Sequence, residues 1–200
     1  MRAAAVVLAA GKSSRMGRNK LLLEVGGRTI LDRVLDALRA SVVDEIVVVL
    51  GHDPQAIRPL VEAHGAKTVL NTEYEKGMTS SFQAGLIATT AEAIFLVLGD
   101  QLGLHSELID GMVILMESDP AAMVVSPVHK GRRGHPVLFR RALIREIMDL
   151  EEGKALREVV LCHEKEHKTV EGSRWCIMDI DTPEDFERAV RLFEANRASP

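Results

Sequence analysis

The sequence predicts an α/β fold with a mostly parallel, doubly wound sheet and helices on both faces. Three observations lead to this expectation. The apolar runs are continuous rather than alternating, as in strands buried on both faces. Segments with helical spacing follow these runs in alternation over the first hundred residues. No repeat, linker or low-complexity stretch divides the 200 residues, so a single domain over residues 1–200 is expected.

The first half of the chain alternates strands and helices. Continuous apolar runs predict strands at residues 2–8, 45–50, 67–70 and 93–98. Apolar residues at helical spacing predict helices at 29–40, 54–64, 77–88 and 106–116. Asp53 and Ser106 are the expected N-caps of the second and fourth of these helices.

The second half is less regular. A strand is expected at 122–126, a polar basic loop at 128–134 and an extended run at 136–139. Short helices are expected at 142–150 and 155–161, and short strands at 169–170 and 176–180. Thr182 and Pro183 mark the start of a closing helix over 183–196, as N-cap and first helical residue.

A small-residue turn directly after the first strand carries concentrated positive charge. Lys12, Arg15, Arg18 and Lys20 lie within nine residues of a chain whose formal net charge is only -4. Glycine and alanine let a backbone come close to a ligand, and cations attract phosphate oxygens. This pattern indicates a polyphosphate site, with a solvated surface loop as the other interpretation.

Two familiar phosphate-binding motifs do not fit this turn. A Walker A loop needs a glycine five residues before Gly11, where the chain has Val6. The dinucleotide pattern G-x-G-x-x-G is also absent. The turn therefore belongs to another class of phosphate site.

Acidic residues follow two of the predicted strands. Asp100 comes directly after the strand at 93–98 and Gly99, and Asp181 follows the strand expected at 176–180. The carboxyl ends of parallel strands share one sheet edge, where ligands bind. Carboxylates beside phosphate oxygens suit Mg²⁺. A metal site is favoured over the alternative of turn or N-cap aspartates.

Composition excludes several other functions. Aromatic residues are only 4%, and the net charge is negative, so neither single-stranded nor duplex nucleic acid is an expected partner. The two cysteines suggest no disulfide framework. No apolar run reaches about 18 residues, so no membrane partner is expected and the cytoplasm is the expected location. The stretch His163-Glu164-Lys165-Glu166-His167 matches H-E-x-x-H, but it lies where helical spacing stops, which argues against a zinc protease.

Five blocks of sequence, in order along nearly the whole chain, resemble the MobA-like nucleotidyltransferases and their molybdenum cofactor cytidylyltransferase branch. The blocks are Leu8-Ala9-Ala10-Gly11-x-Ser13-x-Arg15-Met16-Gly17-x-x-Lys20, Asn71-x-x-Tyr74-x-x-Gly77-Met78-x-Ser80-Ser81, Leu98-Gly99-Asp100-Gln101, Arg133-Gly134-His135-Pro136-Val137-Leu138-Phe139 and Asp179-Ile180-Asp181-Thr182-Pro183-Glu184-Asp185.

The resemblance implies a Rossmann-like nucleotidyltransferase fold and Mg²⁺-dependent transfer of a nucleoside monophosphate, with Mn²⁺ as an alternative ion. It implies a nucleotide-binding part at about 1–101 and an acceptor-binding part with the second metal ligand at about 102–200. The implied nucleotide-binding residues are Leu8, Ala9, Ala10, Gly11, Lys12, Ser13, Lys20, Asn71, Gly77, Ser80, Ser81 and Asp100.

Chemical roles follow for a smaller set of residues. Lys20, Arg15 and Asp100 are the implied catalytic residues, and Asp100 and Asp181 the implied metal ligands. Strand alternation is expected to point Asp179 to the other face. Gln101, Arg133 and His135 lie in the implied acceptor region, where His135 either orients the acceptor or braces its loop.

The implied reaction transfers CMP from CTP to the phosphate of molybdenum-bound molybdopterin and releases pyrophosphate. Ala10 stands where the guanylyl branch has glycine, and its methyl group narrows the pocket against a purine. Leu102 stands where the branch usually has proline, so another phosphorylated acceptor, such as a sugar phosphate, stays open. Another nucleoside triphosphate, or a non-catalytic nucleotide-binding cofactor chaperone, also stays open. A molybdoenzyme or its chaperone is the implied protein partner.

Overall fold

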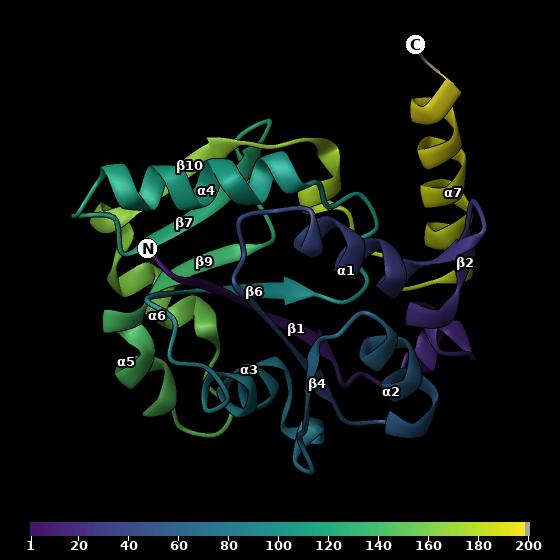
Figure 1. The fold of residues 1–200 in the computed structure, drawn as a ribbon, viewed down its shortest axis with the longest axis horizontal. Coiled ribbons are helices and arrows are strands. Elements are labelled where there is room, and N and C mark those ends of the chain that lie inside the picture. The colour runs from purple at the N-terminus through teal and green to yellow at the C-terminus, as the bar shows by residue number, and fades with distance from the viewer. Residues whose placement is uncertain (199–200) are drawn as a thin grey trace.

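The structure is a computed structural model that describes residues 1–198 (Figure 1). Its main sheet has the strand order β10-β7-β9-β6-β1-β4-β5, with β8 paired to β7. The strands are β1 (Ala3–Ala9), β4 (Glu45–Leu50), β5 (Lys67–Leu70), β6 (Ala93–Leu98), β7 (Val124–His129), β8 (Arg132–Arg133), β9 (Val137–Arg140) and β10 (His167–Glu171). A separate two-stranded sheet joins β2 (Glu24–Val25) and β3 (Arg28–Thr29).

The sheet is parallel from β6 to β5 and mixed from β6 to β10. Strand β1 pairs in parallel with β4 and β6, and β4 pairs in parallel with β5. Strand β9 runs antiparallel to both β6 and β7, while β10 is parallel to β7. The predicted mostly parallel sheet is therefore confirmed, with β9 and the short β8 as the reversed strands.

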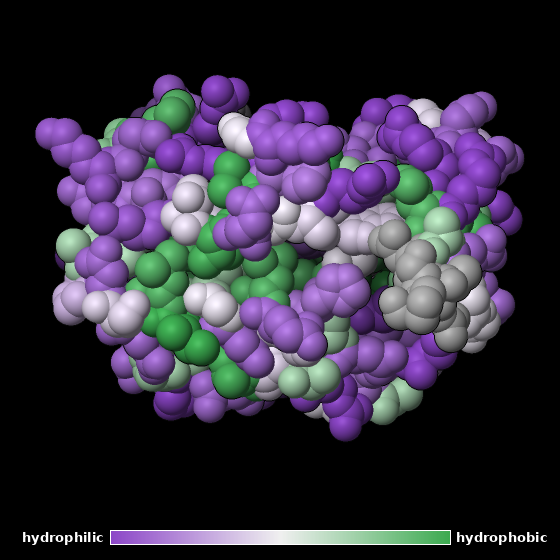
Figure 2. Space-filling view, turned by 90° about the horizontal axis from the view of Figure 1, so that it is seen from above, coloured by the Kyte–Doolittle hydropathy of each residue, from purple (hydrophilic) through white to green (hydrophobic). Residues whose placement is uncertain are grey.

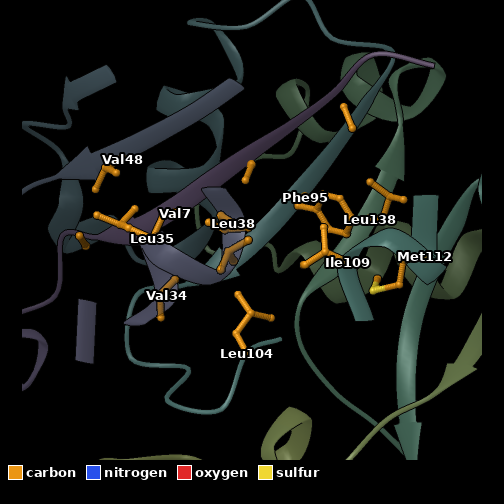
Figure 3. Packing of buried hydrophobic residues seen from close by; sticks show 14 of the residues in the cluster. Val7, Val34, Leu35, Leu38, Val48, Phe95, Leu104, Ile109, Met112 and Leu138 are labelled. Carbon is orange, nitrogen blue, oxygen red and sulfur yellow. The ribbon is translucent and has the colours of Figure 1, made fainter. Parts of the chain in front are cut away.

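Helices cover both faces, because neighbouring residues of each buried strand point to opposite sides. The helices α1 (Ile30–Arg39), α2 (Pro54–Ala63) and α4 (Ser106–Ser118) pack on the face that carries Val7, Val48 and Phe95 (Figure 3). The helices α3 (Met78–Leu86), α5 (Ile144–Met148) and α6 (Leu156–Cys162) pack on the face that carries Val6, Val47 and Ile94.

A third, smaller apolar cluster lies beyond the sheet edge. Helix α7 (Pro183–Ala198) packs there through Ala189, against Trp175, Ile180 and residues of the β2–β3 hairpin. Thr182 caps this helix as expected, since its Oγ1 accepts a hydrogen bond from Asp185 N at 3.2 Å. The packing of this cluster fixes the position of the chain segment that contains Asp179 and Asp181.

Two expectations about local structure need correction. The segment expected as a strand at 176–180 begins instead in a 3₁₀ turn, Arg174–Ile177, because Trp175 and Cys176 are buried by turning inward rather than by pairing in a sheet. The basic loop at 128–134 is a hairpin of β7 and β8 around Lys130 and Gly131, both at positive φ.

The expected N-caps of two helices also differ in detail. Asp53 occupies the cap position of α2, but its side chain makes no capping hydrogen bond because its backbone is left-handed. His105, not Ser106, precedes the first turn of α4.

The outer surface is mostly polar. Seen from above Figure 1, from the side of α4 and β10, a band of apolar residues crosses part of an otherwise polar face (Figure 2). Among the described residues, no helix combines the length and apolar character that crossing a membrane requires.

Candidate active site

An open pocket of about 380 Å³ lies where β1 and β6 end. It collects residues from the turn after β1, the start of α3, the end of β6 and the segment before α7. The lining residues are Leu8, Ala9, Ala10, Gly11, Ser13, Lys20, Leu21, Tyr74, Gly77, Met78, Ser81, Leu98, Asp100, Asp179 and Asp181. Most of the residues implied for nucleotide binding thus meet in one cavity.

The turn after β1 is held by its own backbone and by the core. Ser13 has a left-handed backbone, with φ at 50°, and its Oγ accepts a hydrogen bond from Lys20 N at 3.3 Å. Leu21 is buried in the main core next to Lys20. This anchoring fixes where the Lys20 side chain leaves the backbone.

Lys20 lies between two carboxylates inside the pocket. Its Nζ donates to Asp181 Oδ1 at 3.1 Å and to the Ile180 carbonyl at 2.9 Å, and it also contacts Asp100 Oδ2. The Lys20 side chain is only 18% exposed. Burial alone would lower the pKa of Lys20, but Asp100 and Asp181 outweigh it and raise that pKa, so the ammonium stays charged.

Arg15 approaches the same centre from the solvent side. Its Nη2 lies 2.9 Å from Asp181 Oδ2, and its side chain is 68% exposed. The residues implied as catalytic and the implied metal ligand Asp181 therefore form one connected group of two cations and two carboxylates.

The carboxylates fit a divalent cation that also binds phosphate. Oxygens of Asp100 and Asp181 contact the same ammonium, so both point into one small volume. Within the described residues, no cluster of three or more histidine, cysteine or acidic side chains could hold a metal by itself. Mg²⁺ typically takes one or two carboxylates and completes its shell with phosphate oxygens and water, which agrees with this donor set.

Asp179 departs from expectation. This residue lines the pocket together with Asp100 and Asp181. The prediction that it points away was wrong because the 3₁₀ turn and an irregular segment replace the expected strand, so strand alternation does not apply.

Asn71 and Ser80 do not line the pocket but form hydrogen bonds with the residues next to it. Asn71 Nδ2 donates to Ser80 Oγ at 2.8 Å and to Ser81 Oγ at 3.2 Å, and Asn71 and Ser81 are both buried. Only Ser81 of the three lines the cavity.

Lys12 does not line the pocket. It pairs with Glu75, and its Nζ lies 5.9 Å from the centre of the Tyr74 ring.

Tyr74 and Met78 line the pocket although sequence reasoning gave them no role. Gly51 brings Tyr74 close to Ala10, since a Cβ on Gly51 would lie 2.7 Å from the Ala10 Cβ and from the Tyr74 Cβ. Tyr74 and Met78 both belong to the sequence block that begins at Asn71, and this membership was the sequence signal that could have identified them.

A second pocket of about 620 Å³ adjoins the first on the side of β7, β9 and α6, and Met78 lines both. Most of its wall is apolar, from Leu96, Val137, Phe139, Leu156, Val160 and Leu161. Arg133 and His135 line it as well, whereas Gln101 does not.

Two of the residues implied for acceptor binding hold the wall of this second pocket in place. Gln101 is buried, and its Nε2 donates to the His135 carbonyl. The His135 amide donates to the Cys176 carbonyl at 2.8 Å, a close approach that Gly134 permits because a Cβ there would lie 1.9 Å from the same oxygen. Burial lowers the pKa of His135, although Asp100 and Asp179 oppose this effect, so its imidazole is neutral at neutral pH.

Arg133 and the second H-E-x-x-H histidine have structural partners. Arg133 makes two hydrogen bonds of 2.8 Å to Glu164. His167 is buried and shares a 2.8 Å hydrogen bond with Ser126. Burial lowers the pKa of His167 to about 4.

His163 is separated from His167, as expected for a chance motif. It contacts Glu146 at 3.0 Å, just past the end of α6, while His167 begins β10. The two histidines do not share a helix face, so the zinc-protease geometry is absent.

The sequence model of the family described as MobA-like NTP transferase domain matches residues 5–169. The chain belongs to this family. It is accordingly a nucleotidyltransferase with the family's Rossmann-like α/β fold. Asp179 and Asp181 lie outside the matched range, on the segment that the third apolar cluster carries to the pocket.

Three curated relatives cover most of the chain. The molybdenum cofactor cytidylyltransferase of Escherichia coli is 28% identical, over 90% of this chain and 92% of its own. A probable molybdenum cofactor guanylyltransferase of Methanosarcina acetivorans is 27% identical, over 93% and 89%. The nicotine blue oxidoreductase of Paenarthrobacter nicotinovorans is 30% identical, over 78% and 79%.

Among solved structures, Rv0371c of Mycobacterium tuberculosis superposes with a TM-score of 0.83 at 27% identity, covering 96% of this chain and 98% of its own. A structure of Rv0371c in complex with manganese superposes with a TM-score of 0.79 at 25% identity, covering 96% and 99%.

Proposed function

We propose that this nucleotidyltransferase moves CMP from CTP to the phosphate of molybdenum-bound molybdopterin and releases pyrophosphate. The observation that carries the proposal is the charged Lys20 between Asp100 and Asp181, in a pocket at the ends of β1 and β6. The group has what phosphoryl transfer needs, which is positioning and a countercharge rather than covalent chemistry.

The chain's own residues account for most of the reaction. In the proposed complex, the turn from Ala9 to Ser13 holds the phosphates, Lys20 contacts the α-phosphate, and Arg15 balances charge on its solvent side. Asp100 and Asp181 hold Mg²⁺, with Mn²⁺ as the alternative ion that the relative's manganese complex suggests. The bound cation neutralises charge that develops on the phosphate oxygens.

No general base is needed for the attack. A phosphate monoester is largely dianionic at neutral pH, so one of its oxygens bonds to the α-phosphorus directly. The bond from that phosphorus to the bridging oxygen breaks, and pyrophosphate leaves with the electron pair. The neutral His135 therefore serves to place the acceptor rather than to remove a proton.

CTP is favoured by the packing around Ala10. Ala10 is 5% exposed. It packs so closely with Tyr74 around Gly51 that a Cβ on Gly51 would lie 2.7 Å from each of their Cβ atoms. A wall this close limits the pocket on the base side, which supports a pyrimidine. The guanylyltransferase relative, at nearly the same identity, makes GTP the second candidate.

Molybdopterin is favoured as the acceptor by the second pocket. Its volume of about 620 Å³ and largely apolar wall suit a flat heterocycle, and His135 lies on its side nearest the acidic residues. A sugar phosphate would leave much of this apolar wall without a partner.

Calorimetric titration with CTP, GTP, ATP and UTP, each with Mg²⁺, tests the nucleotide. We expect a clear preference for CTP, and a preference for GTP would replace the cytidylyl proposal with the guanylyl one. Pyrophosphate release with CTP and molybdenum-bound molybdopterin then tests the acceptor, against glucose 1-phosphate as control. Nucleotide binding without any turnover would support the chaperone alternative instead.

A further inference from the structure

A separate pocket of about 470 Å³ lies on the far side of Asp179 and Asp181 from the nucleotide pocket. It is lined by four arginines from four separate segments, which we call the arginine basin. Arg15 comes from the turn after β1, Arg132 from β8, Arg174 from the 3₁₀ turn and Arg188 from α7.

The acidic residues of the basin are mostly committed to other groups. Asp181 already pairs with Arg15 and Lys20. Asp185 accepts hydrogen bonds from Thr182 N at 3.1 Å and from Arg188 at 3.0 Å, so it caps α7 and neutralises Arg188. Asp179 is the remaining carboxylate.

Arg132 and Arg174 are left without a counter-ion. Both are exposed, and within the described residues neither has an ion pair or side-chain hydrogen bond. Two guanidinium groups thus face one uncommitted carboxylate, which gives the basin a net positive charge in a chain whose formal net charge is -4.

The fold directs these two arginines to the basin. Neighbouring side chains on a strand point to opposite sides, and on β8 Arg133 lines the apolar pocket while Arg132 lines the basin. Arg174 is fixed by its neighbour Trp175, which is 5% exposed in the third apolar cluster. A hydrogen bond of 2.8 Å from the His135 amide to the Cys176 carbonyl ties the two segments together near the basin.

We propose that the arginine basin binds a phosphate group next to Asp179 and Asp181. Guanidinium groups present paired N–H donors that match phosphate oxygens, and they stay charged at any relevant pH. If the proposed function holds, this phosphate group belongs either to the released pyrophosphate or to the acceptor. The assignment of the phosphate group to one of these two molecules rests on the proposed function, whereas the anion site itself does not.

Direct binding tests the basin without turnover. In the presence of a metal chelator, inorganic pyrophosphate and glycerol 3-phosphate are titrated separately into the wild-type protein and into the double variant Arg132→Ala, Arg174→Ala. We expect the double variant to bind at least one of the two probes roughly tenfold more weakly. Weakened pyrophosphate binding identifies the leaving group, and weakened glycerol 3-phosphate binding identifies the acceptor phosphate.

A matched control separates a local site from a change in overall charge. Arg2 and Arg145 are exposed and line none of the pockets described above, so the double variant Arg2→Ala, Arg145→Ala removes the same charge elsewhere. We expect this control to bind both probes within about twofold of wild type. Equal losses in the two double variants, or no loss for either probe in the basin variant, would overturn the proposal.

CTP titration with Mg²⁺ keeps this test apart from the proposed function. We expect the basin variant to bind CTP about as well as wild type does. A parallel loss of CTP affinity would place Arg132 and Arg174 in the nucleotide site and overturn a separate basin. Failure of the wild-type protein to bind CTP would instead contradict the proposed function and leave the anion result standing.

Discussion

The two halves of the sheet build their pockets in different ways. At the first pocket, proposed to bind the nucleotide, β1 and β6 are parallel neighbours, and the segment after β1 supplies Ala10, Ser13 and Lys20. At the second pocket, proposed to bind the acceptor, β9 runs antiparallel to its neighbours, and the wall comes from β6, β7, β9, α6 and β10. One contiguous segment therefore supplies about half of the residues that line the first pocket, whereas the wall of the second is assembled from several distant segments.

The largest effect is expected on turnover, from a substitution of Asp100 in the first pocket. Asp100→Asn leaves the shape of the residue but removes the charge that pairs with Lys20 and would hold the cation. Turnover should fall by about 10²–10³-fold, as when one group that stabilises a transition state is lost. Steady-state rates of pyrophosphate release measure this. The exposed Asp149→Asn is the control, and equal rates in the two variants would remove Asp100 from the reaction.

The second-largest effect is expected at His167, which lines the second pocket and should make the free energy of unfolding depend on pH. The pKa of His167 is about 4 in the folded protein and about 6.5 in the unfolded chain. Folding therefore favours the neutral imidazole, and its contribution is complete above pH 6.5 and is lost as pH falls toward 4. The free energy of unfolding should drop across this range by up to about 3 kcal/mol.

Urea unfolding at several pH values, with wild type and His167→Gln, measures this contribution. The free energy of unfolding of His167→Gln should vary less between pH 6.5 and 4 than that of wild type, whereas the exposed His105→Gln should keep the wild-type pH dependence. Identical pH profiles for wild type and His167→Gln would show that the Ser126–His167 contact does not sense protonation.

A smaller effect is expected at the base wall. Ala10→Gly removes the methyl group that packs toward Gly51 and Tyr74. The ratio of CTP affinity to GTP affinity should shift toward GTP by roughly tenfold, since one methyl-sized group in a pocket is worth about 1–3 kcal/mol. Parallel titrations give the ratio. Ala88→Gly, in the turn after α3, is a control for a general effect of glycine, and an unchanged ratio in Ala10→Gly would separate Ala10 from base selection.

The smallest effect concerns the stability of the acceptor wall. Arg133 and Glu164 are 40% and 52% exposed, so their ion pair is weakened by water. Glu164→Gln should change the free energy of unfolding by less than about 1 kcal/mol. A urea titration at neutral pH checks this, and a loss of several kcal/mol would show that the pair holds the second pocket together.

The sequence predicted the regions in which local patterns decide the structure. Continuous apolar runs placed β1, β4 and β6, and the turn after β1 brought Lys20 into the pocket as expected. The segment from Cys176 to Ile180 failed because its apolar residues are buried by a 3₁₀ turn against α7, a tertiary contact that no local pattern reveals. The same contact reversed the expectation for Asp179.

The partners of His167 could not be foreseen either. Ser126 and His167 are 41 residues apart and meet only because β10 pairs with β7. Asn71 and its two serines lie within a quoted block, yet their role behind the pocket wall depends on side-chain directions at the end of β5 and the start of α3.

The position of Lys20 also has a consequence for the order in which ligands arrive. An ammonium held between Asp100 and Asp181 is an internal counter-ion, already seated where a divalent cation would sit. A free metal ion must displace it and leave a partly buried charge without a partner. A cation that arrives with a triphosphate brings phosphate oxygens that can receive the displaced ammonium. Metal and nucleotide should therefore bind with positive thermodynamic linkage, and the substrate-free enzyme should compete poorly for metal ions in the cell.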